Sequence, residues 1–123
     1  MRRILVLSSI LLLAGFQKVE REGPIGESVF AWWAANEVYF VGTVVEERDG
    51  KALVVFEDGE QAWVNTPDQI KRLDVVVGSE VMARWTDGRY YPGRVSRIVG
   101  RALFIDYDDG DEGWTSWAGI AAH

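Results

Sequence analysis

The sequence contains no cysteine, only 3 prolines in 123 residues and a single histidine, His123. Without cysteine, the chain cannot form a disulfide-stabilised fold. With one histidine and no serine or threonine beside a base in the sequence, we expect a non-enzymatic protein that needs no cofactor. Basic residues are also scarce, since 13 Lys and Arg face 19 Asp and Glu for a net charge of -6. This balance argues against a protein that coats nucleic acid or anionic lipid, because phosphate binding depends on excess positive charge.

One long hydrophobic run is present, and it lies at the N-terminus. Arg2 and Arg3 precede an apolar stretch over residues 4–16, which is shorter than the roughly 20 residues that span a bilayer. A basic start followed by a short apolar run is typical of a secretory signal, although a core helix is the alternative. The segment before Phe16 resembles a bacterial lipoprotein box, but Phe16 stands where a lipidated cysteine is required.

We therefore predict that residues 1–20 are a signal peptide or an uncleaved N-terminal anchor helix and that residues 21–28 are a linker. The protein is then exported, as a periplasmic, secreted or membrane-tethered protein of a bacterium. Contact with a membrane is expected only through this N-terminal segment.

The rest of the chain is rich in aromatic residues, within a total of 6 Trp, 4 Tyr and 5 Phe, and it repeats itself. A shift of 51 positions aligns nine pairs: Tyr39 with Tyr90, Phe40 with Tyr91, Gly42 with Gly93, Val44 with Val95, Phe56 with Tyr107, Asp58 with Asp109, Gly59 with Gly110, Glu60 with Asp111 and Trp63 with Trp114. One extra residue in the first copy brings Trp33 onto Trp85. We predict a duplication, with repeats at residues 29–74 and 75–123.

Each repeat has the pattern of several short strands separated by turns. Apolar residues alternate with period two at 103, 105 and 107 and again at 52, 54 and 56, which places each set on one face of a strand. Asp-Gly pairs mark tight turns, because glycine readily takes a positive φ. The sequence thus predicts an all-β protein of two small five-stranded barrels. Each has about 45 residues, a size at which a lone core is marginal, so we expect the two to pack together or share a strand.

The repeated motifs resemble the Tudor and Agenet group of SH3-like barrels, and most closely the tandem Tudor modules that read methylated lysine. The motif begins with an apolar pair and Trp, followed by an Asp-Gly turn and then by Tyr-Pro-Gly-x-Val. It continues with a strand that ends in an aromatic residue, and this residue is followed by an acidic residue, Asp, Gly and a second acidic residue. The second copy, residues 83–95 and 106–111, matches it better. In the first copy, residues 34–37 replace the Asp-Gly turn, and Phe40 and Phe56 replace tyrosines.

The resemblance implies an aromatic cage in each copy. In the second copy it would consist of Trp85, Tyr91, Tyr107, Asp109 and Asp111, and in the first of Trp33, Phe40, Phe56, Asp58 and Glu60. A methylated ammonium keeps its charge but loses hydration, so aromatic faces attract it by cation–π contact. The expected ligand is a methylated lysine or arginine on a protein, or a small quaternary ammonium compound, with the trimethyl form disfavoured. The alternative is that these aromatic residues only fill the core of a small barrel.

Other functions have weaker support in the sequence. A scaffold that holds a protein partner through strand edges and tryptophans, with no cage ligand, is the main alternative. A nucleic-acid interface would use Lys71, Arg72, Arg89, Arg94, Arg97 and Arg101, and is less favoured because acidic turns face these residues. The acidic cluster of residues 106–112 departs from the EF-hand pattern at Gly110 and Asp111, so we expect no metal site.

Overall fold

The structure is a computed structural model that describes residues 25–123. The predicted signal or anchor segment, residues 1–20, lies outside the described residues and stays a prediction. Within the described part the chain is all-β apart from a single turn of 3-10 helix, so the predicted fold class is confirmed at that level. No helix in this part is long and apolar enough to cross a membrane.

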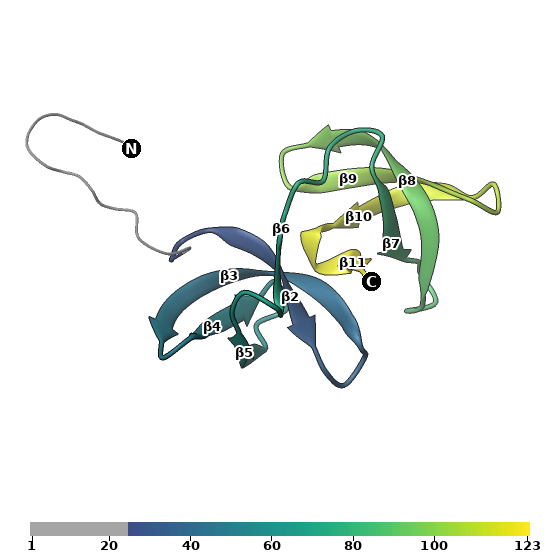
Figure 1. Cartoon of the computed structure of the whole chain (residues 1–123). Coiled ribbons are helices and arrows are strands. Elements are labelled where there is room, and N and C mark those ends of the chain that lie inside the picture. Colours follow the sequence, from purple (N-terminus) through teal and green to yellow (C-terminus); the bar gives the residue numbers. More distant parts are fainter. Residues whose placement is uncertain (1–24) are drawn as a thin grey trace, which may run out of the picture.

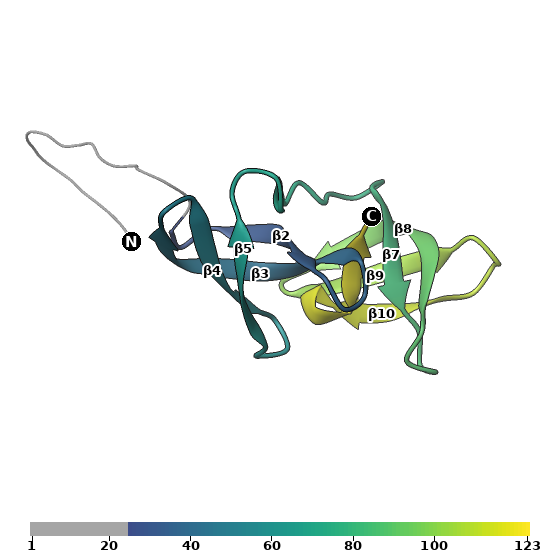
Figure 2. The same ribbon diagram turned by 60° about the horizontal axis from the view of Figure 1, so that its bottom comes forward.

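Both repeats build the same series of strands. The first contains β2 (Ser28–Trp33), β3 (Val38–Arg48), β4 (Lys51–Phe56), β5 (Gln61–Asn65) and β6 (Ile70–Arg72). The second contains β7 (Glu80–Arg84), β8 (Tyr90–Val99), β9 (Ala102–Tyr107), β10 (Glu112–Ser116), the 3-10 turn η2 (Trp117–Gly119) and β11 (Ile120–Ala122). The two groups of strands form two lobes that lie end to end (Figures 1 and 2).

The alternating residues predicted to share a face do share one. Ala52, Val54 and Phe56 on β4 are buried. Their counterparts on β9, residues 103, 105 and 107, are buried as well. The period-two pattern therefore identified the inner face of both strands correctly, because a buried sheet face accepts only every second side chain.

The predicted closed barrels are wrong in one respect, because the hydrogen-bonded ladders stay open. Each repeat has five paired strands, but β5 pairs only with β4, and β10 pairs only with β9. In the first repeat the three-residue β6 pairs only with β2. In the second repeat, β11 pairs with β7 on one side and with β3 of the first repeat on the other, so no edge of β11 is left to pair with β10. The result is one continuous 10-stranded sheet.

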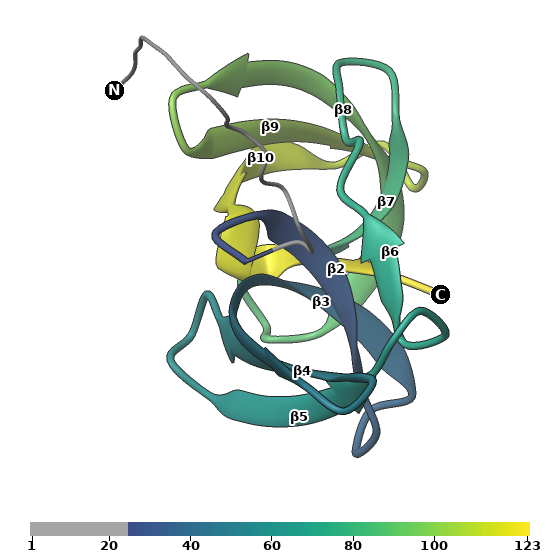
Figure 3. The same cartoon turned by 60° about the vertical axis from the view of Figure 1, so that its left-hand side comes forward.

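Strand β11 joins the two repeats. Ala121 pairs with Met82 of β7 on one side and with Phe40 of β3 on the other, and both pairings are antiparallel. In Figure 3, β11 lies between the strands of the second repeat and β2 and β3 of the first. The expectation that the repeats pack together or share a strand is confirmed.

The two hydrophobic cores are also shared across the repeats. One core consists of first-repeat residues, among them Val29, Ala31 and Val54. The other is centred on the second repeat but includes Phe30 and Val41 of the first. Strand β2 thus buries consecutive residues in different cores, which requires apolar side chains on both of its faces.

Turn geometry differs between the copies at one aligned position. Gly88 in the Asp-Gly turn has a φ of 84°, as the sequence predicts. Its counterpart Glu37 has a φ of 55°, a conformation that is costly for a residue with a Cβ atom. The first copy therefore forms its turn without a glycine at the position where φ is positive.

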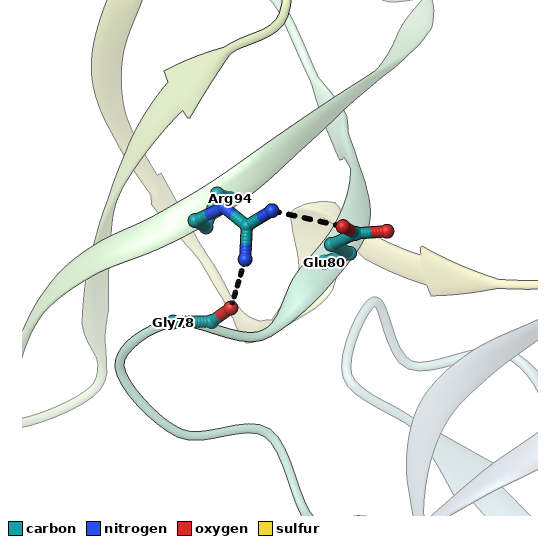
Figure 4. Close-up of polar contacts among 3 residues, drawn as sticks. All are labelled: Gly78, Glu80 and Arg94. Atoms are coloured by element: carbon teal, nitrogen blue, oxygen red, sulfur yellow. Dashed lines mark hydrogen bonds and ion pairs between the residues drawn. The ribbon is translucent and has the colours of Figure 1, made fainter.

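One side chain, Arg94, contacts the chain where it enters the second repeat. Arg94 on β8 donates hydrogen bonds to the carbonyl of Gly78 at 2.8 Å and to the Glu80 carboxylate at 2.9 Å (Figure 4). Both contacts are exposed, so we expect them to orient the segment before β7 rather than to contribute much stability.

Candidate functional site

A cavity of about 420 Å³ lies where the first repeat meets the second. It is lined by Trp33, Asn36, Phe40, Val41, Phe56, Glu57, Asp58 and Glu60 of the first repeat, and by Arg84, Tyr90 and Ala118 of the second. The five residues predicted for a first-copy cage therefore all line one cavity. The second repeat contributes residues that the motif did not include.

The aromatic part of the cavity is made by strand ends. Trp33 is the last residue of β2 and Phe56 is the last residue of β4, and their rings meet edge to face at 5.2 Å between centroids. Phe40 on β3 and Tyr90 on β8 form a second, tilted pair at 5.7 Å. Phe56 is buried in the first core, whereas Trp33, Phe40 and Tyr90 are half-buried. Four rings from four strands thus line a space that remains accessible.

The acidic part of the cavity is the turn between β4 and β5. Asp58 accepts a hydrogen bond from the backbone N–H of Glu60 at 2.9 Å, which is the side-chain-to-backbone bond that shapes such turns. Glu57 forms an ion pair with Arg101 of the second repeat. Asp58 and Glu60 are exposed and form no ion pair with any described residue. Two acidic residues therefore line the same cavity as the rings and have no ion-pair partner in this part of the chain.

Tyr90 brings the second repeat into the cavity. Its hydroxyl donates a long hydrogen bond of 3.4 Å to the carbonyl of Ala118. Burial raises the pKa of Tyr90 above its ordinary value, while the charge of Arg84 acts to lower it and that of Asp58 acts to raise it. Charges of both signs therefore lie close to this hydroxyl.

The corresponding residues of the second copy are arranged differently. Trp85 and Tyr107 form an edge-to-face pair at 5.2 Å, as Trp33 and Phe56 do. Tyr107 is only 6% exposed, and its hydroxyl donates to the carbonyl of Arg84 at 3.0 Å. The same burial raises the pKa of Tyr107, with a smaller contribution from the Asp109 charge.

Tyr91, the third predicted ring of the second copy, is tied to a turn. Its hydroxyl donates to the Asp87 carboxylate at 2.6 Å, and this bond is the main reason why the pKa of Asp87 is lowered and that of Tyr91 raised. Asp109 accepts from the backbone N–H of Asp111 at 3.0 Å, as Asp58 does in the first copy. None of the five residues predicted for a second-copy cage lines the cavity of about 420 Å³.

Sequence reasoning missed Arg84 and Tyr90 as residues of the site. The alignment of Tyr90 with Tyr39 was visible, but nothing in the sequence indicated that Tyr90 would face the other repeat. Tyr39 itself has a different environment, because the Lys71 ammonium lies 4.3 Å from its ring centroid. The two aligned tyrosines thus differ in their surroundings. The ring of Tyr39 is in contact with the ammonium of Lys71, whereas Tyr90 lines the cavity.

The other tryptophans lie away from this cavity. Trp63 and Trp114 are 43% and 49% exposed, and each has an arginine over its ring, Arg48 and Arg97 respectively. Trp32 packs against Tyr39, and Trp117 packs against the second-repeat core. Neither Trp63 nor Trp114 lines the cavity between the repeats.

Three of the six basic residues considered for nucleic-acid binding have polar partners within the protein. Arg94 is paired with Glu80, and Arg101 is paired with Glu57. Lys71 donates to the carbonyl of His123, in addition to its contact with Tyr39. Across residues 25–123 the structure also contains no group of three or more His, Cys, Asp or Glu side chains that could hold a metal ion.

Comparison with known proteins gives partial matches. No protein-family model matches the sequence. Over 45 residues the chain is 36% identical to metal-response element-binding transcription factor 2 of Homo sapiens, and equally to that of Mus musculus. Each match covers 35% of this chain and 8% of the relative, so the chain spans a small part of either protein.

Among solved structures, the chain is similar to the ADCP1 tandem Agenet domain 3-4. The sequences are 20% identical, the TM-score is 0.36, and the match covers 80% of this chain and 79% of the other.

Proposed function

We propose that this protein is a non-enzymatic binding module whose inter-repeat cavity takes an alkylated ammonium group. The group would be carried by a methylated lysine or arginine of a protein, or by a small quaternary ammonium compound. The proposal rests on one observation: four aromatic rings and two carboxylates without a described ion-pair partner line a single accessible cavity.

The physical basis is the match between this lining and an alkylated cation. Ring faces attract such a cation by about 0.5–2 kcal/mol each, and more where water is excluded. Asp58 and Glu60 add Coulomb attraction and can accept a remaining N–H of a partly methylated amine. A mono- or dimethylated ligand should therefore bind more tightly than a trimethylated one.

A matched pair of variants of the full chain tests the proposal by calorimetric titration. The ligands are choline and peptides that carry unmodified, dimethylated or trimethylated lysine. Trp33→Ala should weaken binding of the methylated ligands by roughly tenfold or more, because it removes one wall of the cavity. Trp85→Ala removes the equivalent ring of the second copy and should leave the affinity within about twofold.

The result that would overturn the proposal is a folded wild-type protein that gives no heat with any methylated ligand. A scaffold that holds a protein partner through strand edges or exposed tryptophans would then be favoured. Loss of binding in Trp85→Ala but not in Trp33→Ala would instead move the site to the second copy. Circular dichroism of both variants establishes that each remains folded.

We also propose that the protein is exported, on the basis of the basic and apolar N-terminal pattern. The ligand would then come from the cell envelope or its surroundings. Fractionation of cells that express the full chain with a C-terminal tag tests this location. Recovery of the protein only from the cytoplasm, at full length, would contradict it.

A further inference from the structure

The cavity that we propose for an ammonium group also contains one basic side chain, Arg84. Arg84 is the last residue of β7, and its register partner across the ladder is Tyr90 of β8. Residues directly opposite each other on neighbouring strands project from the same face of a sheet. The side chains of Arg84 and Tyr90 therefore project from the same face of the sheet, and both residues line the cavity.

Arg84 is exposed and has no carboxylate partner among residues 25–123. In this respect it differs from Arg94 and Arg101 of the same repeat, which form ion pairs with Glu80 and Glu57. It also makes no ion pair with Asp58, although both lie close enough to Tyr90 to act on its pKa. The cavity thus holds positive and negative charges that do not neutralise each other by direct contact.

A ligand that carries charge of only one sign is repelled by part of such a cavity. A simple cation is attracted by Asp58 and Glu60 but repelled by Arg84, and a simple anion meets the reverse. A molecule with both charges satisfies both sides, because an arginine binds a carboxylate or phosphate through charge-assisted hydrogen bonds. The volume of about 420 Å³ falls within the range of small-molecule sites, so there is room for both groups.

We propose that the ligand is zwitterionic: an alkylated ammonium lies against the rings and the two carboxylates, and an anionic group joined to it by a short spacer binds Arg84. This inference rests on the ammonium-binding function proposed above and specifies its ligand class. The anionic group belongs to the same molecule and is a carboxylate or a phosphate.

The test compares two ligands with the same trimethylammonium group. Choline ends in a hydroxyl and glycine betaine in a carboxylate, so only glycine betaine offers Arg84 an anion. Full-chain wild-type protein should bind glycine betaine about tenfold more tightly than choline in calorimetric titrations, as expected for a charge-assisted contact. γ-Butyrobetaine, with a longer spacer, and phosphocholine, with a phosphate, identify which spacing and which anion fit best.

Arg84→Gln should remove this preference. Affinity for glycine betaine should fall about tenfold, and affinity for choline should stay the same or rise because a repulsive charge is gone. Arg72→Gln is the matched control, since it removes the same charge from an exposed residue of β6 that does not line the cavity. It should leave both affinities unchanged.

Several results separate the two proposals. Choline and glycine betaine binding equally well to the wild type, or an equal loss of both in Arg84→Gln, would overturn the zwitterion proposal and leave the ammonium site standing. Absence of binding by every trimethylammonium probe would overturn the zwitterion proposal, and absence of binding by the dimethylated-lysine peptide as well would overturn both. A preference for phosphocholine that is lost in Arg84→Gln would support the zwitterion proposal and identify the anion as a phosphate.

Discussion

Phe56 and Tyr107 occupy the same position in the two repeats, and both rings are buried beneath a tryptophan. Phe56 lines the cavity between the repeats, whereas Tyr107 does not. The hydroxyl of Tyr107 is bonded to the carbonyl of Arg84, and that of Tyr91 is bonded to Asp87, whereas Phe56 and Phe40 have no hydroxyl to bond. In the second repeat the tyrosines of the motif thus form hydrogen bonds within that repeat. In the first repeat phenylalanines stand at these positions, and they line a cavity.

The largest expected effect comes from removing the Tyr107 ring. Tyr107→Ala should lower the free energy of unfolding by about 3–5 kcal/mol, because it leaves a cavity in the core and an unpaired Arg84 carbonyl. Urea denaturation measures the loss. Trp114→Ala serves as control, since that ring is 49% exposed and should cost much less. Equal losses in the two variants would contradict a core role for Tyr107.

The repeats should behave alike at their aligned glycines. A Cβ atom on Gly42 would lie 2.5 Å from Val54 Cγ1, and one on Gly93 would lie 2.7 Å from Ile105 Cγ2. Gly42→Ala and Gly93→Ala should each cost about 1–3 kcal/mol through this overlap. Thermal unfolding checks both. In Gly113→Ala the nearest atom is Trp85 Cζ3 at 3.4 Å, so a smaller loss is expected there.

Removing the hydroxyl of Tyr107, or adding one to Phe56, tests whether this hydroxyl accounts for the difference between the two repeats. Tyr107→Phe should lower the unfolding free energy by about 1 kcal/mol, the net value of one hydrogen bond. Phe56→Tyr places a hydroxyl at the same position of the first repeat and should weaken choline binding, because the added group fills part of the cavity or bonds across it. Urea denaturation and calorimetric titration measure the two effects. Unchanged choline affinity in Phe56→Tyr would show that the hydroxyl does not distinguish the two sites.

The smallest expected effect is a change in the pKa of Asp87 when the hydroxyl of Tyr91 is removed. The Tyr91 hydroxyl lowers the pKa of Asp87 below its ordinary 3.8, so the contribution of this bond to stability is present above that value and is lost as pH falls through the lowered pKa. Tyr91→Phe should raise the pKa of Asp87 toward the ordinary value, as measured by an NMR titration of its carboxyl carbon. Tyr90→Phe should leave it unchanged.

The sequence was sufficient to predict strands and their inner faces. The period-two runs at residues 52–56 and 103–107 gave the correct buried side chains, and the glycine of the turn at Gly88 has the positive φ expected. These features depend on neighbours in the chain, so local pattern determines them.

The joint between the repeats could not be predicted in the same way. β11 has three residues, with no alternation to mark them as a strand that pairs on both sides. The positions of Arg84 and Tyr90 beside the first-repeat rings follow from that pairing. A site assembled from both repeats is therefore invisible to motifs that are read one repeat at a time.

The double pairing of β11 also affects how the chain is completed during synthesis. The first repeat leaves the ribosome early, but the edge of β3 at Tyr39 and Phe40 acquires its partner only when Ala121 and Ala122 emerge. At about 5–20 residues per second, the nascent chain displays this unpaired edge for seconds. Exposed strand edges are templates for aggregation, so until β11 arrives this edge of the first repeat can pair with a strand of another chain.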